Sequence, residues 1–141
     1  MPNIGAESRN EQGITGYLLV VRGKDWDQTL SDDELQEVMD RTTQWFDALM
    51  KTGKVKGGNA LERRGVTVSG KGGSVVTDGP FAESKEAVGG YLLLDVSTLE
   101  EAVEIARSSP GVDYGMTIEV RPVLDECPVF KRVRARLGLA A

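Results

Sequence analysis

The order of hydrophobic periodicities along this chain constrains its fold more than any other feature of the sequence. Residues 16–22 alternate with a period of two and are apolar on both faces, which predicts a strand at the centre of a sheet. A helix is predicted next, with Ser31 and Glu34 forming a capping box at its start and Gly53 placed to end it. Its predicted core stripe consists of Leu35, Val38, Met39, Thr42, Trp45, Phe46 and Leu49.

The rest of the chain repeats this order after a group of short strands. Antiparallel strands joined by tight turns are predicted at 55–61, 66–68 and 74–77. Residues 88–96 form a further strand, and Ser97 with Glu100 makes a second capping box for a helix that Pro110 stops. Residues 116–123 form the last strand. This order predicts an α+β protein, a ferredoxin-like split β-α-β sandwich with an extra β-hairpin.

The two helices of such a fold cover one face of the sheet and leave the other face bare. We place Tyr17, Leu19 and Tyr91 on the bare face from their parity within the predicted strands. An apolar sheet face exposed to water needs a partner, so the sequence predicts a homodimer that forms through the sheet.

The length of 141 residues suits one domain of ordinary size. We expect a flexible N-terminal arm at 1–13, the folded domain at 14–124 and a C-terminal extension at 125–141, with a short helix within 128–139. The sequence shows no early signal-like apolar run and no apolar stretch long enough to span a bilayer. A cytoplasmic protein that does not contact membranes is therefore expected.

Composition removes several kinds of chemistry. A net charge of −5 argues against general nucleic-acid binding, which requires a basic surface. Cys127 is the one cysteine and histidine is absent, so an intramolecular disulfide, a cysteine-based zinc site and a Ser-His or Cys-His nucleophile are excluded. We expect neither a metal nor another cofactor.

The stretch from Thr77 to Tyr91 reads T-D-G-P-F-A-E-S-K-E-A-V-G-G-Y and begins with a turn signal at Asp78-Gly79-Pro80. Its D-G-P-F, A-E-S-K-E and G-G-Y blocks resemble the signature of the YCII-related domain family, in its DGPF subgroup, and the similarity extends over about residues 16–123. The resemblance implies a dimeric α+β barrel built from two sheets. It also implies a link to extracytoplasmic-function sigma factors, for which no residue gives independent support.

Members of the wider YCII-related family are suspected of being enzymes, because a histidine and an aspartate meet in the cleft of the barrel. This chain contains no histidine, so that acid/base pair is not transferred to it. Whether the protein is an enzyme therefore stays open at the level of sequence.

Glu119 and Arg121 are the most informative charged pair, because they lie two residues apart on one face of the last strand. If Ile118 and Val120 face the helices, both charges face the cleft between subunits. The pair can hold a polar or anionic ligand, or Glu119 can act as a base if its pKa is raised. A structural ion pair between the two is the favoured alternative.

Asp78 is the second candidate carboxylate, at the mouth of the same cleft, with Arg22 or Lys85 as its counter-charge. The simpler interpretation is a turn residue that binds backbone amides. Tyr17 and Tyr91 suit a ligand cavity or a buried interface equally well. The catalytic candidates are Asp78 and Glu119, and the ligand-binding candidates are Tyr17, Arg22, Asp78, Tyr91, Glu119 and Arg121.

These observations favour a homodimeric protein that binds a small polar or anionic molecule in the cleft. One alternative is an enzyme that uses carboxylate acid/base chemistry from Asp78 or Glu119. The other is an accessory or regulatory protein, on the strength of the family resemblance.

Overall fold

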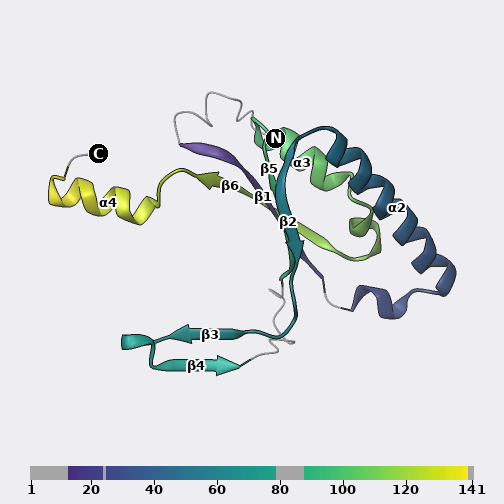
Figure 1. The fold of residues 1–141 in the computed structure, drawn as a ribbon, viewed down its shortest axis with the longest axis horizontal. Coiled ribbons are helices and arrows are strands. Elements are labelled where there is room, and N and C mark those ends of the chain that lie inside the picture. The colour runs from purple at the N-terminus through teal and green to yellow at the C-terminus, as the bar shows by residue number, and fades with distance from the viewer. Residues whose placement is uncertain (1–12, 24, 79–87, 140–141) are drawn as a thin grey trace.

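The computed structural model describes residues 13–23, 25–78 and 88–139 (Figure 1). Its main sheet has four antiparallel strands in the order β2-β5-β1-β6, and β3 pairs with β4 in a separate two-stranded sheet. The strands are β1 (Ile14–Arg22), β2 (Val55–Ala60), β3 (Val66–Ser69), β4 (Val75–Asp78), β5 (Val88–Leu94) and β6 (Thr117–Leu124). The α-helices are α2 (Asp32–Lys51), α3 (Leu99–Arg107) and α4 (Pro128–Leu137), and short 3-10 helices are η1 (Trp26–Thr29), η2 (Lys71–Gly73) and η3 (Pro110–Tyr114).

The predicted fold class is confirmed at the level of an α+β protein whose main sheet is compatible with the ferredoxin-like arrangement. Helices α2 and α3 lie on one side of the main sheet (Figure 1). β1 lies between β5 and β6, as its two apolar faces predicted. A terminal helix forms at α4, and the predicted hairpin forms from β3 and β4.

The sequence predicted the N-terminal cap of α2 correctly but not that of α3. At α2 the capping box is as predicted: the Ser31 hydroxyl accepts the Glu34 N–H at 3.2 Å, and the Glu34 carboxylate accepts the Ser31 N–H at 3.0 Å. At α3 the prediction of Ser97 with Glu100 is wrong by one residue. Thr98 has the extended backbone of an N-cap, and its hydroxyl accepts the Glu101 N–H at 3.1 Å. Ser97 and Thr98 both carry hydroxyl groups, so the sequence alone did not show which of the two caps the helix.

The core lies between the main sheet and α3. It contains Ile14, Tyr17, Leu19, Leu94, Val96, Ala102 and Ala106. Ile118 and Val120 pack against this cluster, which confirms the predicted parity of β6. Ala102 and Ala106 of α3 belong to the same buried cluster as the aromatic side chain of Tyr17.

The placement of Tyr17 and Leu19 on the bare face is wrong. Both are buried in the helix-side core, with exposed fractions of 1% and 0%. Because both faces of β1 are apolar, its alternation could not show which set of residues meets the helices. Tyr91 does lie on the other face, since it is opposite Val20, whereas Tyr17 is opposite Leu94.

Helix α2 is less closely packed than its apolar stripe predicted. Of that stripe only Val38 and Leu49 are buried, while Met39 and Phe46 remain exposed. The helix is attached mainly to the segment around η3, and a space separates its middle turns from the sheet.

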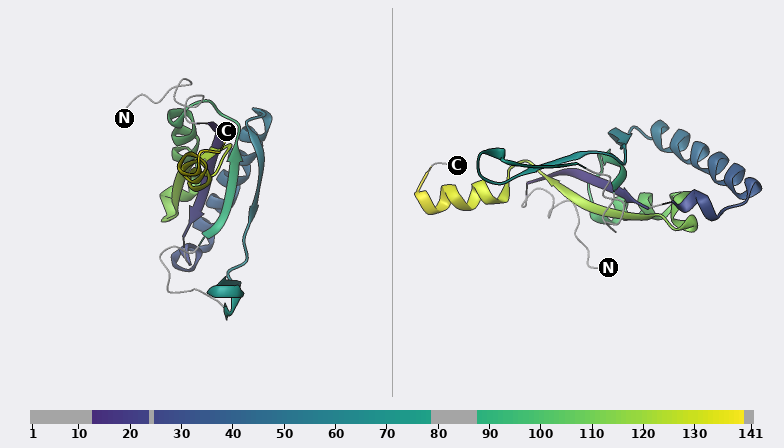
Figure 2. Two further views of the ribbon diagram at one scale, coloured as in Figure 1. Left: turned by 90° about the vertical axis from the view of Figure 1, so that its left-hand side faces the viewer. Right: turned by 90° about the horizontal axis from the view of Figure 1, so that it is seen from below.

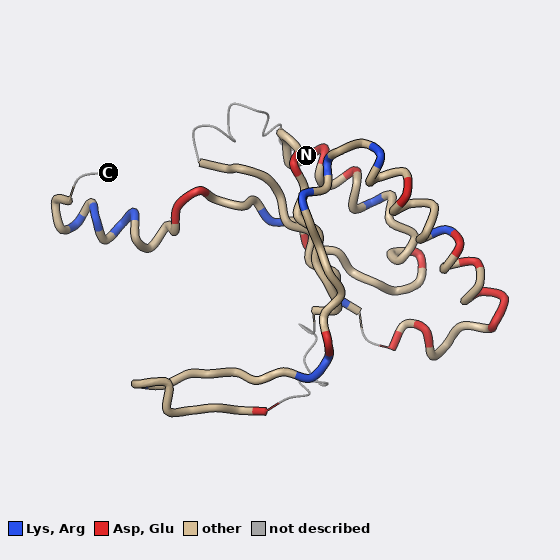
Figure 3. The backbone as a smooth tube through the Cα atoms, viewed as in Figure 1, with Lys and Arg blue, Asp and Glu red and all other residues tan. Residues whose placement is uncertain are grey.

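Two segments project from the uncovered side of the main sheet, which we call the open face. They are the β3–β4 hairpin and α4, and both extend away from the side that carries α2 and α3 (Figures 1 and 2). Exposed apolar side chains occur on both segments: Val66, Val68, Val75 and Val76 on the hairpin, and Val129, Phe130, Val133 and Leu137 on α4. Basic residues alternate with the apolar ones along α4 (Figure 3).

Several predictions concern residues outside the described ranges. These are the flexible arm, apart from Gly13, and the signature loop from Gly79 to Ala87. None of the described helices is both long enough and apolar enough to cross a membrane.

Candidate functional site

Three charged side chains meet on the open face, one from β1 and two from β6. Arg22 donates hydrogen bonds to Glu119 Oε2 from Nη2 at 2.9 Å and from Nε at 3.2 Å. Arg121 Nε donates to the other carboxylate oxygen, Oε1. We call Arg22, Glu119 and Arg121 the charged cluster.

The register between β1 and β6 produces this cluster. Val20 of β1 lies opposite Glu119 of β6. Arg22 is two residues after Val20 and shares its face, so it is a diagonal neighbour of the Glu119 carboxylate. Arg121 follows Glu119 by two residues and therefore shares its face. The sequence indicated the Glu119–Arg121 pair, but it associated Arg22 with Asp78 rather than with Glu119.

Both arginines favour the ionised form of Glu119. Its pKa is lowered from the ordinary value of 4.5, first by the hydrogen bonds from Arg22 and then by that from Arg121. Glu119 is therefore a carboxylate at neutral pH and a weak proton acceptor. With two cations and one anion, the cluster carries a formal charge of +1.

Arg121 is the exposed member of the cluster. Its side chain is 67% exposed, against 32% for Glu119 and 23% for Arg22. Among the described residues Arg121 contacts Glu119 through Nε alone, so its two terminal Nη groups keep their donors for another acceptor. A guanidinium in this state can bind a carboxylate or phosphate in bidentate fashion.

The described residues next to the cluster on the open face are mostly uncharged. One row across the sheet pairs Asn59 with Tyr91, Tyr91 with Val20 and Val20 with Glu119. Within this row, Asn59 Nδ2 donates to Tyr91 Oη at 3.5 Å. Since adjacent strands lie about 4.8 Å apart, Tyr91 and Glu119 are separated by roughly 10 Å of sheet.

The neighbouring row pairs Leu93 with Leu18 and Leu18 with Arg121. The open face thus combines an apolar centre with a phenol–amide pair on one side and the charged cluster on the other. Leu18, Val20 and Asn59 were not among the predicted site residues, and the strand register that selects them was the missing signal.

The predicted residues fall into two groups. The structure brings Arg22, Glu119 and Arg121 together, with Tyr91 on the same face. Tyr17 lies on the opposite face, in the core, and Asp78 lies at the end of β4, paired with Val66. No ion pair joins Asp78 to any residue that the structure describes.

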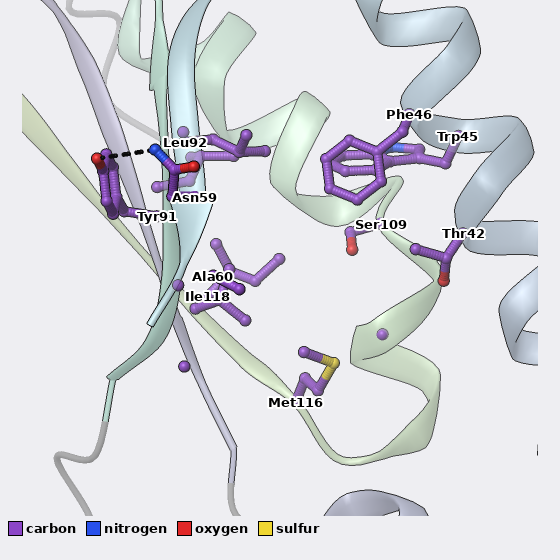
Figure 4. Close-up of a pocket in the computed structure, with 16 residues that line it drawn as sticks. Thr42, Trp45, Phe46, Asn59, Ala60, Tyr91, Leu92, Ser109, Met116 and Ile118 are labelled. Atoms are coloured by element: carbon purple, nitrogen blue, oxygen red, sulfur yellow. Dashed lines mark hydrogen bonds between the residues drawn. The ribbon is translucent and has the colours of Figure 1, made fainter. Parts of the chain in front are cut away.

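A pocket lies on the helix-covered side of the sheet, beneath α2 (Figure 4). It has a volume of about 270 Å³. The described residues that line it are Leu19, Val21, Thr42, Trp45, Phe46, Gly58, Asn59, Ala60, Gly89, Gly90, Tyr91, Leu92, Ser109, Gly111, Met116 and Ile118. We call this space the α2 pocket.

The described part of the chain contains no group of three or more Cys, Asp or Glu side chains placed to hold a metal ion. The charged cluster supplies one carboxylate between two guanidinium groups, an environment that suits an anion better than a cation.

Comparison with known proteins establishes the class of this protein. The family model of the YCII-related domain matches residues 15–126, so the chain belongs to the YCII-related domain family. The chain is also similar to an uncharacterized protein of Rhizobium meliloti (strain 1021), with 42% identity over 53 residues. That similarity spans 37% of this chain and 43% of the relative, which is less than half of either protein.

Proposed function

We propose that this protein is a homodimer of the DGPF subgroup that binds a small polar or anionic molecule on the open face, in a cleft closed by the second copy. The observation that supports the proposal best is the charged cluster. It holds a formal charge of +1, it lies next to an apolar centre, and the terminal groups of Arg121 contact none of the described residues.

The cluster is suited to binding because its geometry is set before a ligand arrives. Glu119 holds Arg22 from one side and Arg121 from the other, which restricts the rotamers of both long side chains. A ligand carboxylate would meet Arg121 without paying the full cost of ordering its side chain. Tyr91 and Asn59 would contact the polar end of a ligand that crosses the face.

The two projecting segments support the dimer. A two-stranded hairpin is marginally stable on its own in water, yet β3 and β4 are exposed along their whole length. The hairpin and α4 extend on the open-face side, so a second copy on that face would lie between them (Figures 1 and 2). Covering the exposed valines and α4 would add to a standard interface of about 1,600 Å².

Acid/base catalysis by Glu119 is less well supported than binding. A general base near neutral pH requires a carboxylate with a raised pKa, whereas the pKa of Glu119 is lowered by two arginines. The binding proposal requires the ionised carboxylate that the cluster provides.

Calorimetric titration of the full chain with succinate and with inorganic phosphate tests the proposal. We expect saturable binding that Arg121→Ala abolishes. The matched control is Arg107→Ala, because Arg107 has a similarly exposed side chain (68%) and also pairs with a glutamate. Equal affinity in all three proteins would disprove the anion site, and a monomer in light scattering would disprove the closed cleft.

A further inference from the structure

We infer that the α2 pocket is a separate binding site for an uncharged aromatic molecule of one or two rings. It lies on the opposite side of the sheet from the charged cluster, because its lining residues Leu19 and Ile118 alternate with the open-face residues of β1 and β6.

Polar contacts hold α2 to the α3–η3 segment instead of to the sheet. Arg41 donates to Asp113 Oδ2 at 2.8 Å and to the Tyr114 hydroxyl at 3.3 Å. One turn later, Trp45 Nε1 donates to Ser108 Oγ at 2.8 Å. These bonds fix the middle of α2 at its present distance from β5 and β6, so the space beneath it is defined by specific contacts.

Aromatic and aliphatic side chains form the two walls of the pocket. On the α2 side, the rings of Trp45 and Phe46 meet edge to face with centroids 4.9 Å apart. Because Ser108 satisfies the indole N–H, Trp45 presents its apolar surface to the pocket. On the sheet side, Leu92 and Ile118 face these rings (Figure 4).

Glycines supply part of the sheet-side surface. Gly58 of β2 and Gly90 of β5 lie on the face of the sheet that the helices cover. A larger residue at either position would cover the backbone there. A Cβ at Gly58 would lie 2.5 Å from the Tyr91 carbonyl oxygen and 2.6 Å from Leu92 Cδ2. The strands therefore approach so closely there that the hollow depends on glycine.

The lining specifies the chemistry of the ligand. None of the described residues that line the pocket is charged, and Thr42 and Ser109 contribute hydroxyl groups. A charged molecule would lose its hydration without a counter-charge, whereas a neutral ring would bury apolar surface and could use one hydroxyl. An apolar cavity of about 150 Å³ binds benzene, so 270 Å³ has room for a two-ring molecule.

The two faces of the sheet are thereby assigned to different ligand classes. Asn59 and Tyr91 are among the lining residues of the α2 pocket, but their strand positions place their side chains on the open face, where they bond to each other (Figure 4). A neutral aromatic ligand beneath α2 does not require Arg121, and an anion at Arg121 does not require the α2 pocket. Failure of one proposal can therefore be distinguished from failure of the other.

Indole is the neutral probe, and indole-3-acetate is its charged counterpart. Titrations of the full chain, followed by calorimetry and by Trp45 fluorescence in a Trp26→Phe background, should show saturable indole binding. Indole-3-acetate should bind at least tenfold more weakly. The Arg121→Ala variant should bind indole as the wild type does.

Filling the pocket provides the decisive comparison. Thr42→Phe places a ring in the space and should weaken indole binding at least tenfold, whereas Thr43→Phe changes an exposed neighbour on the same helix and should leave it within twofold. If Thr42→Phe does not fold, Ala60→Leu enters the same space from β2. Absence of saturable indole binding, or equal losses in the filling and control variants, overturns the inference. Phe130 is an exposed apolar residue of α4. If indole binds only after Phe130→Ser, α4 of another copy occupies the pocket in the unchanged protein, and the inference is overturned.

Discussion

Arg22 and Glu119 come from strands that are far apart in the sequence, and they form a two-point contact with N–O distances of 2.9 and 3.2 Å. Arg121 completes the arrangement from the other side of the carboxylate. Glu119 thus belongs to two ion pairs at once. This explains why its pKa is lowered and why it serves better as an organising anion than as a proton acceptor.

The first prediction concerns coupling within the cluster. Glu119→Ala should lower the melting temperature, because two guanidinium groups would then repel each other without the intervening anion. Arg22→Ala should cost more than Arg121→Ala, since Arg22 is the less exposed partner and donates twice. The Arg22→Ala/Glu119→Ala protein should recover part of the summed loss. Strict additivity in thermal melts would contradict this coupling.

The second prediction concerns pH. Because the folded-state pKa of Glu119 is below its ordinary value, the carboxylate contributes stability above that value and loses it as pH falls through the folded-state pKa. The difference in unfolding free energy between wild type and Glu119→Gln should be constant above about pH 5.5 and should shrink below the ordinary pKa of 4.5. Urea titrations between pH 3 and pH 7 would measure it. If this difference grows as the pH falls, the folded-state pKa of Glu119 is not lowered and the prediction is contradicted.

The third prediction separates the two tyrosines. Tyr17→Ala should destabilise the protein by about 3–5 kcal/mol, as expected for loss of a large side chain from a core. Tyr91→Ala should cost much less in stability, because Tyr91 lies half-buried on the open face, and should instead weaken ligand binding or dimerisation. Chemical denaturation of both variants is the measurement. Similar losses for both would place Tyr91 in the core as well.

The fourth prediction concerns adjacent glycines of β2. Gly58→Ala should destabilise by about 1–3 kcal/mol, because the new methyl group would meet the Tyr91 carbonyl and Leu92 at overlapping distances. At Gly57 the added Cβ would meet no neighbour within 4 Å, so Gly57→Ala is the control and should be nearly neutral. The comparison requires only melting curves of the two proteins. Equal stability would show that β2 and β5 separate at little cost.

The fifth prediction concerns the hairpin in the proposed dimer. Val68 and Val76 are cross-strand partners that share one face of the β3–β4 ribbon, while Thr67 lies on the other face. Val68→Asp should raise the dimer dissociation constant at least tenfold if the valine face contacts the second copy. Thr67→Asp should have a smaller effect. Sedimentation over a range of concentrations would show whether either change alters association.

The sequence by itself determined the succession of helices and strands, because the signals for these elements act over a few neighbouring residues. These signals are the hydrophobic periodicity, the capping box of Ser31 and Glu34, and the helix-ending Gly53. It also determined that Glu119 and Arg121 share a face, since alternation along a strand is local. The YCII-related motifs identified the family, which the match over residues 15–126 confirmed.

Tertiary structure alone decided which face of β1 meets the helices and which arginine reaches Glu119. β1 is apolar on both sides, so only its packing against Ala102 and Ala106 assigns Tyr17 to the core. Likewise the Arg22–Glu119 contact depends on the register of two strands that are separated by most of the chain. Parity is a property of a few adjacent residues, whereas face and register result from long-range contacts that no local pattern encodes.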